Sequence, residues 1–175
     1  MVVNNGYRLA PWADVLYACD YDWWAHNGGR TDFAGLRIGG DVRDGKWGVR
    51  PVKIDMRRDE ILVHKFGTIG CGGNSGFQAL NLAVQFGSRN IILVGYDMHD
   101  RAGVHWHGKH GSGLNNPSRA SLARWRGVID GQAPMLERMG VRVINASPDS
   151  ALTAYPKMTF SAALAACTER ANVVA

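Results

Sequence analysis

The 175-residue sequence lacks the features that mark membrane, secreted and disulfide-bonded proteins. No apolar run reaches the roughly 18 residues that a membrane-spanning helix needs. The N-terminus lacks the basic stretch followed by an apolar core that is typical of a secretion signal. The three cysteines lie far apart without a Cys-x-x-Cys pair, which excludes a zinc ribbon and a disulfide framework. We therefore expect no membrane partner and a reducing, cytoplasmic setting.

The sequence also lacks the charge clusters that are typical of nucleic-acid-binding proteins. Its net charge is +5, which favours an anionic partner, but the basic residues are scattered and form no block of lysine and arginine. The six tryptophans come without any RNA- or DNA-binding motif, so packing explains them better than base stacking. We expect no nucleic-acid partner, and a nucleotide ligand and an ordinary basic surface remain as alternatives.

The expected secondary structure alternates between strands and helices. Apolar runs predict strands near residues 2–4, 14–20, 61–66, 90–97 and 141–147, with weak edge strands at 35–40 and 50–55 in an otherwise irregular stretch. Helices are predicted at residues 21–26, 75–86, 119–139 and 159–171. This alternation predicts an α/β, Rossmann-like fold with a mostly parallel sheet and helices on both faces. We expect residues 1–175 to form a single Rossmann-like domain.

A glycine-rich turn, GCGGNSG at residues 70–76, precedes the expected helix at 75–86. Glycine lets the backbone approach a ligand closely, and the free N–H groups of a first helical turn favour negative charge. Asn74 and Ser75 add side-chain donors and acceptors, and Ser75 is our candidate for the helix N-cap. The turn matches neither Gly-x-Gly-x-x-Gly nor a P-loop, so a tight turn without a ligand is the alternative.

Two acids, Asp20 and Asp97, end the apolar runs DVLYACD and NIILVGYD. Ligands of open parallel sheets bind at the carboxyl ends of the strands. We therefore expect both acids to face one crevice, with Asp97 beside the start of the helix at Ser75. The alternative is that each acid only caps a turn.

A histidine-rich stretch, HWHGKH, contains His105, His107 and His110. This spacing in a loop could hold a metal ion, with Asp97 or His99 completing the ligands. The same stretch could instead supply one general base, because an unperturbed histidine titrates near neutral pH. We assign no metal and interpret the stretch as a source of a general base, with the metal site as the alternative.

The segment GGNSGFQALNLAVQFGSRNIILVGYDM, residues 72–98, resembles the core of the 6-hydroxymethylpterin diphosphokinase-like group of Rossmann-like proteins. Its layout is also similar to that of the bacterial sialyltransferases of glycosyltransferase family 42. Those enzymes carry a His-aromatic-x-Gly-His stretch and then a Pro-x-Ser-x-Leu segment, and HWHGKH and SPDSALTAYP follow here in the same order. The resemblance covers Val2 to about Pro156, and the whole chain also resembles proteins commonly encoded by bacteriophages.

The resemblance implies a nucleotide-dependent transferase that moves a glycosyl or pyrophosphoryl group from a nucleotide-linked donor, such as a cytidine monophosphate sugar or ATP. It places Asp97 and His99 beside the phosphate or the acceptor, with Asp97 among the catalytic residues. It makes His110 the base that deprotonates an acceptor hydroxyl, with His107 as its rival. The implied nucleotide-binding residues are Asn4, Asp20, Gly73, Asn74, Ser75, Gly76 and His99.

The sequence departs from both families at its start, because MVVNNGY has no preceding strand and no Gly-x-Gly-Pro-Ser-like turn. Part of the expected phosphate-binding surface is therefore missing, and a non-catalytic module that binds a nucleotide or a partner is one alternative. A metal-dependent hydrolase that uses the histidine-rich stretch is another. A sheet without its first strand would leave an open edge, so we also expect a homo-oligomer. A phage-encoded chain would work in the cytoplasm of a bacterial host.

Overall fold

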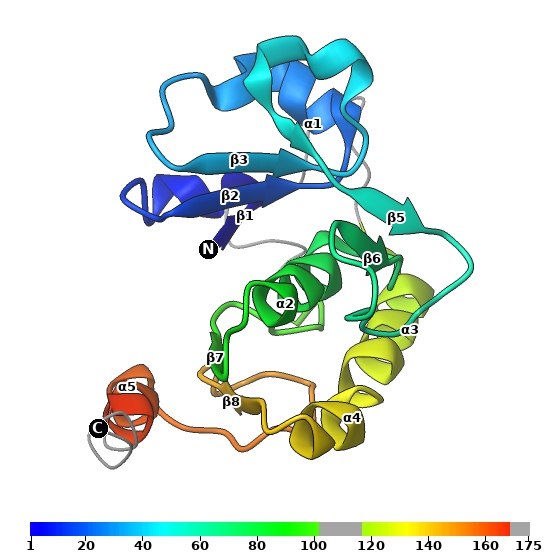
Figure 1. Cartoon of the computed structure of the whole chain (residues 1–175). Coiled ribbons are helices and arrows are strands. Elements are labelled where there is room, and N and C mark those ends of the chain that lie inside the picture. Colours follow the sequence, from blue (N-terminus) through cyan, green and yellow to red (C-terminus); the bar gives the residue numbers. More distant parts are fainter. Residues whose placement is uncertain (102–116, 169–175) are drawn as a thin grey trace. The chain divides into compact units, whose positions relative to one another are not determined.

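The computed structural model describes residues 1–101 and 117–168, which fall into two compact units. The described residues of the N-terminal unit are 1–86, and those of the C-terminal unit are 87–101 and 117–168. Every paired strand runs parallel to its neighbour, with helices interleaved along the chain (Figure 1). The expected α/β fold with a Rossmann-like arrangement is confirmed, whereas a single domain over residues 1–175 stays a prediction.

The N-terminal unit contains a four-stranded parallel sheet in the order β1-β2-β3-β4. The strands are β1 (Val2–Val3), β2 (Val15–Ala18), β3 (Leu36–Gly39) and β4 (Arg50–Pro51). The expected edge position of residues 35–40 is wrong, because β3 pairs on both sides, with β2 and β4. Gly39 at the end of β3 is closely packed: a Cβ there would lie 2.4 Å from Val42 and 2.8 Å from Trp24, which favours glycine.

Short helical turns and one cluster of aromatic residues complete this part of the unit. The 3-10 helices are η1 (Asn4–Arg8), η2 (Gly28–Arg30) and η3 (Arg43–Gly48), and α1 spans Tyr21–His26. Trp23 and Trp24 of α1 are buried, with ring centroids 5.0 Å apart in an edge-to-face arrangement. The Trp24 Nε1–H donates to Ala18 O at 3.1 Å, so these tryptophans pack in the core as expected.

A second parallel pair, β5 (Lys53–Asp55) and β6 (Thr68–Gly70), leads into α2 (Ser75–Gln85). The strand expected at residues 61–66 is wrong. Ile61 and Leu62 are buried there, but the Leu62 backbone bonds to the side chain of Asn81 instead of to a neighbouring strand. A continuous apolar run indicates burial, and burial alone does not make a strand.

The C-terminal unit is built on the parallel pair β7 (Asn90–Leu93) and β8 (Arg142–Asn145). Its helices are α3 (Arg119–Asp130), α4 (Ala133–Arg138) and α5 (Phe160–Thr168). The single helix expected at 119–139 is wrong, because Pro134 lacks an N–H and occupies the start of α4.

The state of the cysteines and the character of the helices can be compared with what the sequence predicts. Cys19, Cys71 and Cys167 are free, in keeping with the absence of a disulfide framework. None of the helices within residues 1–101 and 117–168 has both the length and the apolar character needed to cross a membrane.

Candidate functional site

The glycine turn, residues 70–76, joins the carboxyl end of β6 to the N-terminus of α2. Asn74 caps the helix: its backbone is extended (φ −153°), and its Oδ1 accepts the Phe77 N–H at 2.9 Å. The expectation that Ser75 is the N-cap is therefore wrong by one residue. Ser75 already has a helical position, and an N-cap must lie outside the helix.

The first half of the glycine turn packs against protein. A Cβ at Gly70 would lie 2.1 Å from Glu60 O, and a Cβ at Gly72 would lie 1.9 Å from the Phe77 ring. Gly72 also has a positive φ of 57°, which favours glycine. These two glycines are explained by internal packing and need no ligand.

The backbone N–H groups of this first half are also used within the protein. The Gly70 N–H donates to Asn81 Oδ1 at 3.0 Å, and the Cys71 N–H donates to Arg58 O at 2.7 Å. The Gly72 N–H donates to the carboxylate of Asp59 at 3.0 Å. The Gly72 N–H is therefore already bonded to an anionic group of the protein itself, the Asp59 carboxylate.

The second half of the glycine turn is partly exposed, and this is where a ligand can approach. The N–H groups of Gly73 and Ser75 have no acceptor among the residues that the structure describes. They lie at the N-terminal end of α2, where the helix dipole favours negative charge. An anion-binding role for the turn stays a prediction, and the N–H groups of Gly73 and Ser75 are its candidates.

An open pocket of about 670 Å³ lies at the loop that follows β5 in the same unit. Arg58 pairs with Glu60 and with Asp55, whereas the Arg57 guanidinium has no ion pair among the described residues. The Asp59 contact with Gly72 links this loop to the glycine turn. We call this space the β5 pocket; its lining is Asp55, Arg57, Arg58, Asp59 and Glu60.

Asn4 and Asp20 follow neighbouring parallel strands, β1 and β2, at the carboxyl edge of the four-stranded sheet. Asp20 precedes α1 without making a side-chain cap bond. Desolvation, together with the charges of Asp22 and Asp41, raises the pKa of Asp20. The strand ends therefore gather acids at this edge, and a nucleotide-binding role for Asn4 and Asp20 stays a prediction.

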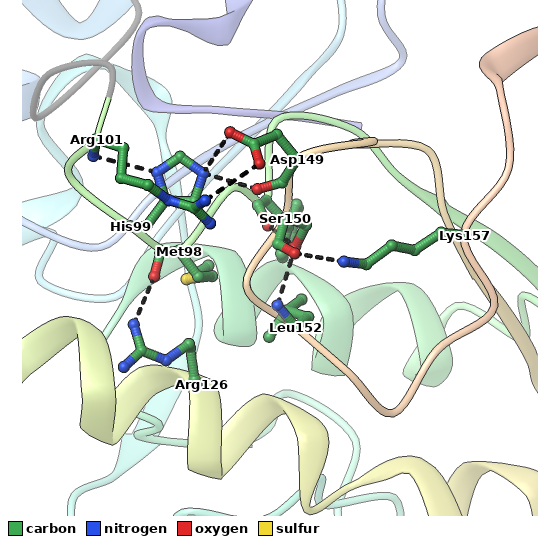
Figure 2. Close-up of polar contacts among 9 residues, drawn as sticks. Met98, His99, Arg101, Arg126, Asp149, Ser150, Leu152 and Lys157 are labelled. Carbon is green, nitrogen blue, oxygen red and sulfur yellow. Dashed lines mark hydrogen bonds and ion pairs between the residues drawn. The ribbon is translucent and has the colours of Figure 1, made fainter.

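In the C-terminal unit, His99 links the loop after β7 to the loop after β8 (Figure 2). Its Nε2 lies 2.7 Å from Asp149 O, and the Arg101 N–H donates to its Nδ1 at 3.3 Å. Because Nδ1 accepts, the proton of the neutral ring lies on Nε2, which donates to Asp149. Both ring nitrogens therefore have protein partners, and the side chain is only 10% exposed.

The backbone next to His99 is held in an unusual conformation. Met98 has a φ of 57°, which is uncommon for a residue with a side chain, and Arg126 Nη1 donates to its carbonyl at 2.9 Å. Ser150 Oγ donates to Tyr96 O at 2.5 Å and accepts the Leu152 N–H at 3.1 Å. Residues held in rare conformations are concentrated at functional sites, which draws attention to this loop.

Asp97, also a candidate, has an exposed side chain, while its backbone carbonyl accepts the Ala151 N–H at 2.8 Å. Asp97 belongs to the C-terminal unit, and Asp20 and Ser75 belong to the N-terminal unit. The shared crevice expected for these residues therefore involves both units and stays a prediction.

The histidines expected to act as base or metal ligands, His105, His107 and His110, lie outside the described residues. Within residues 1–101 and 117–168, no group of three or more His, Cys, Asp or Glu side chains is arranged to hold a metal ion. The roles of the three histidines as general base or as metal ligands both stay predictions.

The structure also brings forward residues that the sequence reasoning missed. Arg57 and Asp59 lie in a stretch without a motif, and tertiary contacts of their loop, with Cys71 and Gly72, associate them with the glycine turn. Arg119 and Arg126 were detectable, because their spacing around Leu122 places all three on one face of a helix.

Comparisons with protein-family models, with curated proteins and with solved structures found no significant match. The resemblance to diphosphokinase-like proteins and sialyltransferases therefore stays a prediction. The coarser expectation, an α/β chain with a parallel sheet, is what the structure shows, in the form of a four-stranded parallel sheet in the N-terminal unit.

Proposed function

We propose that the N-terminal unit binds the phosphates of a nucleotide-linked donor at the glycine turn, and that the chain is a nucleotide-dependent transferase. The observation that supports this most is the pair of N–H groups of Gly73 and Ser75, which have no acceptor among the described residues. Ser75 opens the first turn of α2, and Gly73 directly precedes the N-cap Asn74. Backbone donors at a helix N-terminus form a favourable site for phosphate.

The β5 pocket supplies the other groups that a nucleotide needs. The Arg57 guanidinium, which has no ion pair among the described residues, can bind a phosphate oxygen. Asp55 is the last residue of β5, and its carboxylate can accept a hydrogen bond from a ribose hydroxyl, as acids near the strand ends of nucleotide-binding folds do. The pocket volume of about 670 Å³ lies within the usual range for small-molecule sites.

Asp59 acts against this binding. Its carboxylate lies 3.0 Å from the Gly72 nitrogen, so a phosphate at the neighbouring N–H groups meets a negative charge at short range. The site therefore favours a ligand whose charge is shared between the helix N-terminus and Arg57. Asp59 also gives the proposal a specific test, which is described below.

The transfer step is assigned to the histidine-rich stretch by resemblance. His110, or its rival His107, takes the proton of an acceptor hydroxyl while the hydroxyl oxygen attacks the donor. The nucleotide leaves with the electron pair of the broken bond, so charge and atoms balance. Asp97 remains a candidate for orienting the acceptor or the base.

Calorimetry with cytidine and adenine nucleotides tests the binding part. We expect one nucleotide to bind saturably, and Arg57→Ala to weaken it about tenfold, the loss of roughly one charge-assisted hydrogen bond. Arg50→Ala is the matched control, because Arg50 is an exposed arginine of the same unit that lies outside the β5 pocket. Equal affinities for both variants, or no binding at all, would contradict the proposal.

Turnover is tested separately, by donor hydrolysis with the wild type, His110→Ala and His107→Ala. Loss of activity in one variant with unchanged nucleotide affinity supports the transferase. Nucleotide binding without any hydrolysis identifies a binding module instead. Hydrolysis of phosphate esters that a chelator abolishes, without need of a nucleotide, identifies a metal-dependent hydrolase.

A further inference from the structure

A second charged pocket, of about 340 Å³, lies within the C-terminal unit. Three segments enclose it: the residues after β7, one face of α3 and the loop after β8. We call it the arginine pocket; its lining beside His99 is Asp100, Arg101, Arg119, Leu122, Arg126 and Ala151. None of these arginines belongs to the nucleotide site proposed above.

Helix α3 contributes both basic groups and an apolar wall. Arg119, Leu122 and Arg126 are spaced by three and four residues, which places them on the same helical face. Leu122 is buried, with 7% of its surface exposed. A guanidinium on each side of an apolar wall is an arrangement that strengthens the attraction for an anion, because the wall keeps water away.

The charges of the arginine pocket do not cancel. Arg119 Nε lies 3.2 Å from Asp100 Oδ2, and this hydrogen bond lowers the pKa of Asp100, so the acid is ionised at neutral pH. Arg101 Nη1 lies 3.6 Å from Asp149 Oδ1.

Arg126 is different, because it has no acidic partner among the described residues. Its Nη1 donates to Met98 O at 2.9 Å, and the remaining N–H groups of the guanidinium are available. Two carboxylates thus face three guanidiniums, and the pocket keeps a positive charge.

The backbone and the His99 ring beside the pocket are held in place before any ligand arrives. The Met98 carbonyl that Arg126 contacts belongs to a residue with a φ of 57°, and the Arg101 N–H bonds to the fixed ring of His99 (Figure 2). A rigid frame of this kind reduces the entropy lost when a ligand binds.

We propose that the arginine pocket binds the phosphate group of a small phosphorylated molecule, with Arg126 as its main contact and Arg101 and Arg119 as its flanks. The fork of a guanidinium matches two phosphate oxygens. The ion pairs of Arg101 and Arg119 are solvent-exposed, so both side chains can turn from their acids to a doubly charged ligand at little cost. The volume suits a ligand of sugar-phosphate size.

Backbone amide NMR of the full chain, titrated with inorganic phosphate and with ribose 5-phosphate, tests this proposal. We expect saturable shifts at residues 99–101 and 119–126. Arg101→Gln with Arg119→Gln should weaken binding about tenfold, the loss of two phosphate contacts at an exposed site. Both side chains are largely exposed, so this double variant should stay folded. Arg126→Met should weaken binding further.

Arg138→Gln is the matched control, because Arg138 is an exposed arginine of α4 that does not line the pocket, and it should leave the affinity unchanged. Three results would overturn the proposal: no saturable shift at residues 99–101 and 119–126, equal affinity for the double variant and the control, or acetate binding as tightly as phosphate. Shifts confined to residues 73–76 would count for the nucleotide site and against this one.

Discussion

The turn after β6 and the loop after β7 both leave the carboxyl end of a parallel strand, yet they present different hydrogen-bond donors to solvent. The glycine turn offers backbone N–H groups, at Gly73 and Ser75, and its side chains contribute little. The loop after β7 uses its backbone and the His99 ring for internal bonds. Its Arg101 guanidinium lines a pocket together with Arg119 and Arg126 of α3. The two anion sites proposed above therefore rest on different groups: a helix N-terminus in one case and an arginine cluster in the other.

The two segments also differ in how they are supported. The glycine turn depends on buried amide side chains: Asn81 bonds to Leu62 and to Gly70, and the Gln78 Nε2 donates to Cys71 O at 2.8 Å. The loop after β7 depends on several partly exposed contacts, among them those of His99, Ser150 and Arg126. We therefore expect single substitutions to damage the glycine turn more than the loop after β7.

The largest effect is expected for Asn81→Leu. Asn81 is fully buried, and its Oδ1 accepts the N–H groups of Leu62 and Gly70, both at 3.0 Å. Leucine has a similar size but leaves two buried donors without acceptors, which should lower the free energy of unfolding by about 4 kcal/mol. Urea denaturation measures this, and a loss below about 1 kcal/mol would remove the difference in support between the two segments.

Gly72→Ala should have the next largest effect and lower the free energy of unfolding by about 3 kcal/mol. The new Cβ would meet the Phe77 ring at 1.9 Å, and the φ of 57° adds strain. Gly87→Ala is the control, because Gly87 also has a positive φ, of 84°, but nothing lies within 4 Å of its added Cβ. The control should lose only about 1 kcal/mol, and similar losses for both would show that packing does not explain Gly72.

The Cys19 thiol, just after β2 in the N-terminal unit, should react slowly with alkylating reagents. Burial, aided by the charge of Asp20, raises the pKa of Cys19 to about 11. Alkylation requires the thiolate, so Cys19 at pH 8 should react about 100-fold more slowly in the folded protein than in guanidinium chloride. Iodoacetamide labelling read by mass spectrometry measures this, and the rate should rise tenfold per pH unit towards 10. Equal folded and unfolded rates would contradict the burial of this thiol.

His99→Ala should lower the free energy of unfolding by a smaller amount, about 1 kcal/mol. The variant removes one bond to Asp149 and one from Arg101, both near the surface of the C-terminal unit. Hydrogen exchange should show faster opening of Arg101 with little change in global stability. A global loss as large as that of Asn81→Leu would reverse the comparison of the two segments.

The smallest effect concerns affinity. Asp59→Asn keeps an oxygen that can accept the Gly72 N–H, 3.0 Å away, and removes the negative charge beside the proposed phosphate site. Nucleotide binding should become about fivefold tighter, the effect of roughly 1 kcal/mol of relieved repulsion. Weaker binding in this variant would show that Asp59 holds the ligand instead of opposing it.

The elements that the sequence predicted well are those whose pattern is local. The helix at 75–86 and the parallel strands near 14–20, 90–97 and 141–147 follow from apolar spacing, and the structure has them with bounds shifted by a few residues. The single helix expected at 119–139 is divided in the structure, and Pro134, visible in the sequence, is the local signal for the second start.

The errors that no pattern could have avoided involve contacts between distant residues. Residues 61–66 have the composition of a strand, but Asn81 satisfies the Leu62 backbone and no ladder forms. Likewise, nothing near Asp59 indicates that its carboxylate reaches Gly72. Predicting the turn was therefore possible, whereas predicting which of its N–H groups remain for a ligand required the fold.

The shared attachment of Leu62 and Gly70 to one amide side chain has a consequence for local dynamics. Neither segment can leave its place without breaking a bond to Asn81, so the start of the turn and the 61–62 segment should open and close as one cooperative unit. The amide protons of Leu62 and Gly70 should then exchange with the same opening free energy, although residues 63–69 lie between them along the chain. A ligand that tightens the glycine turn would slow exchange at Leu62 as well.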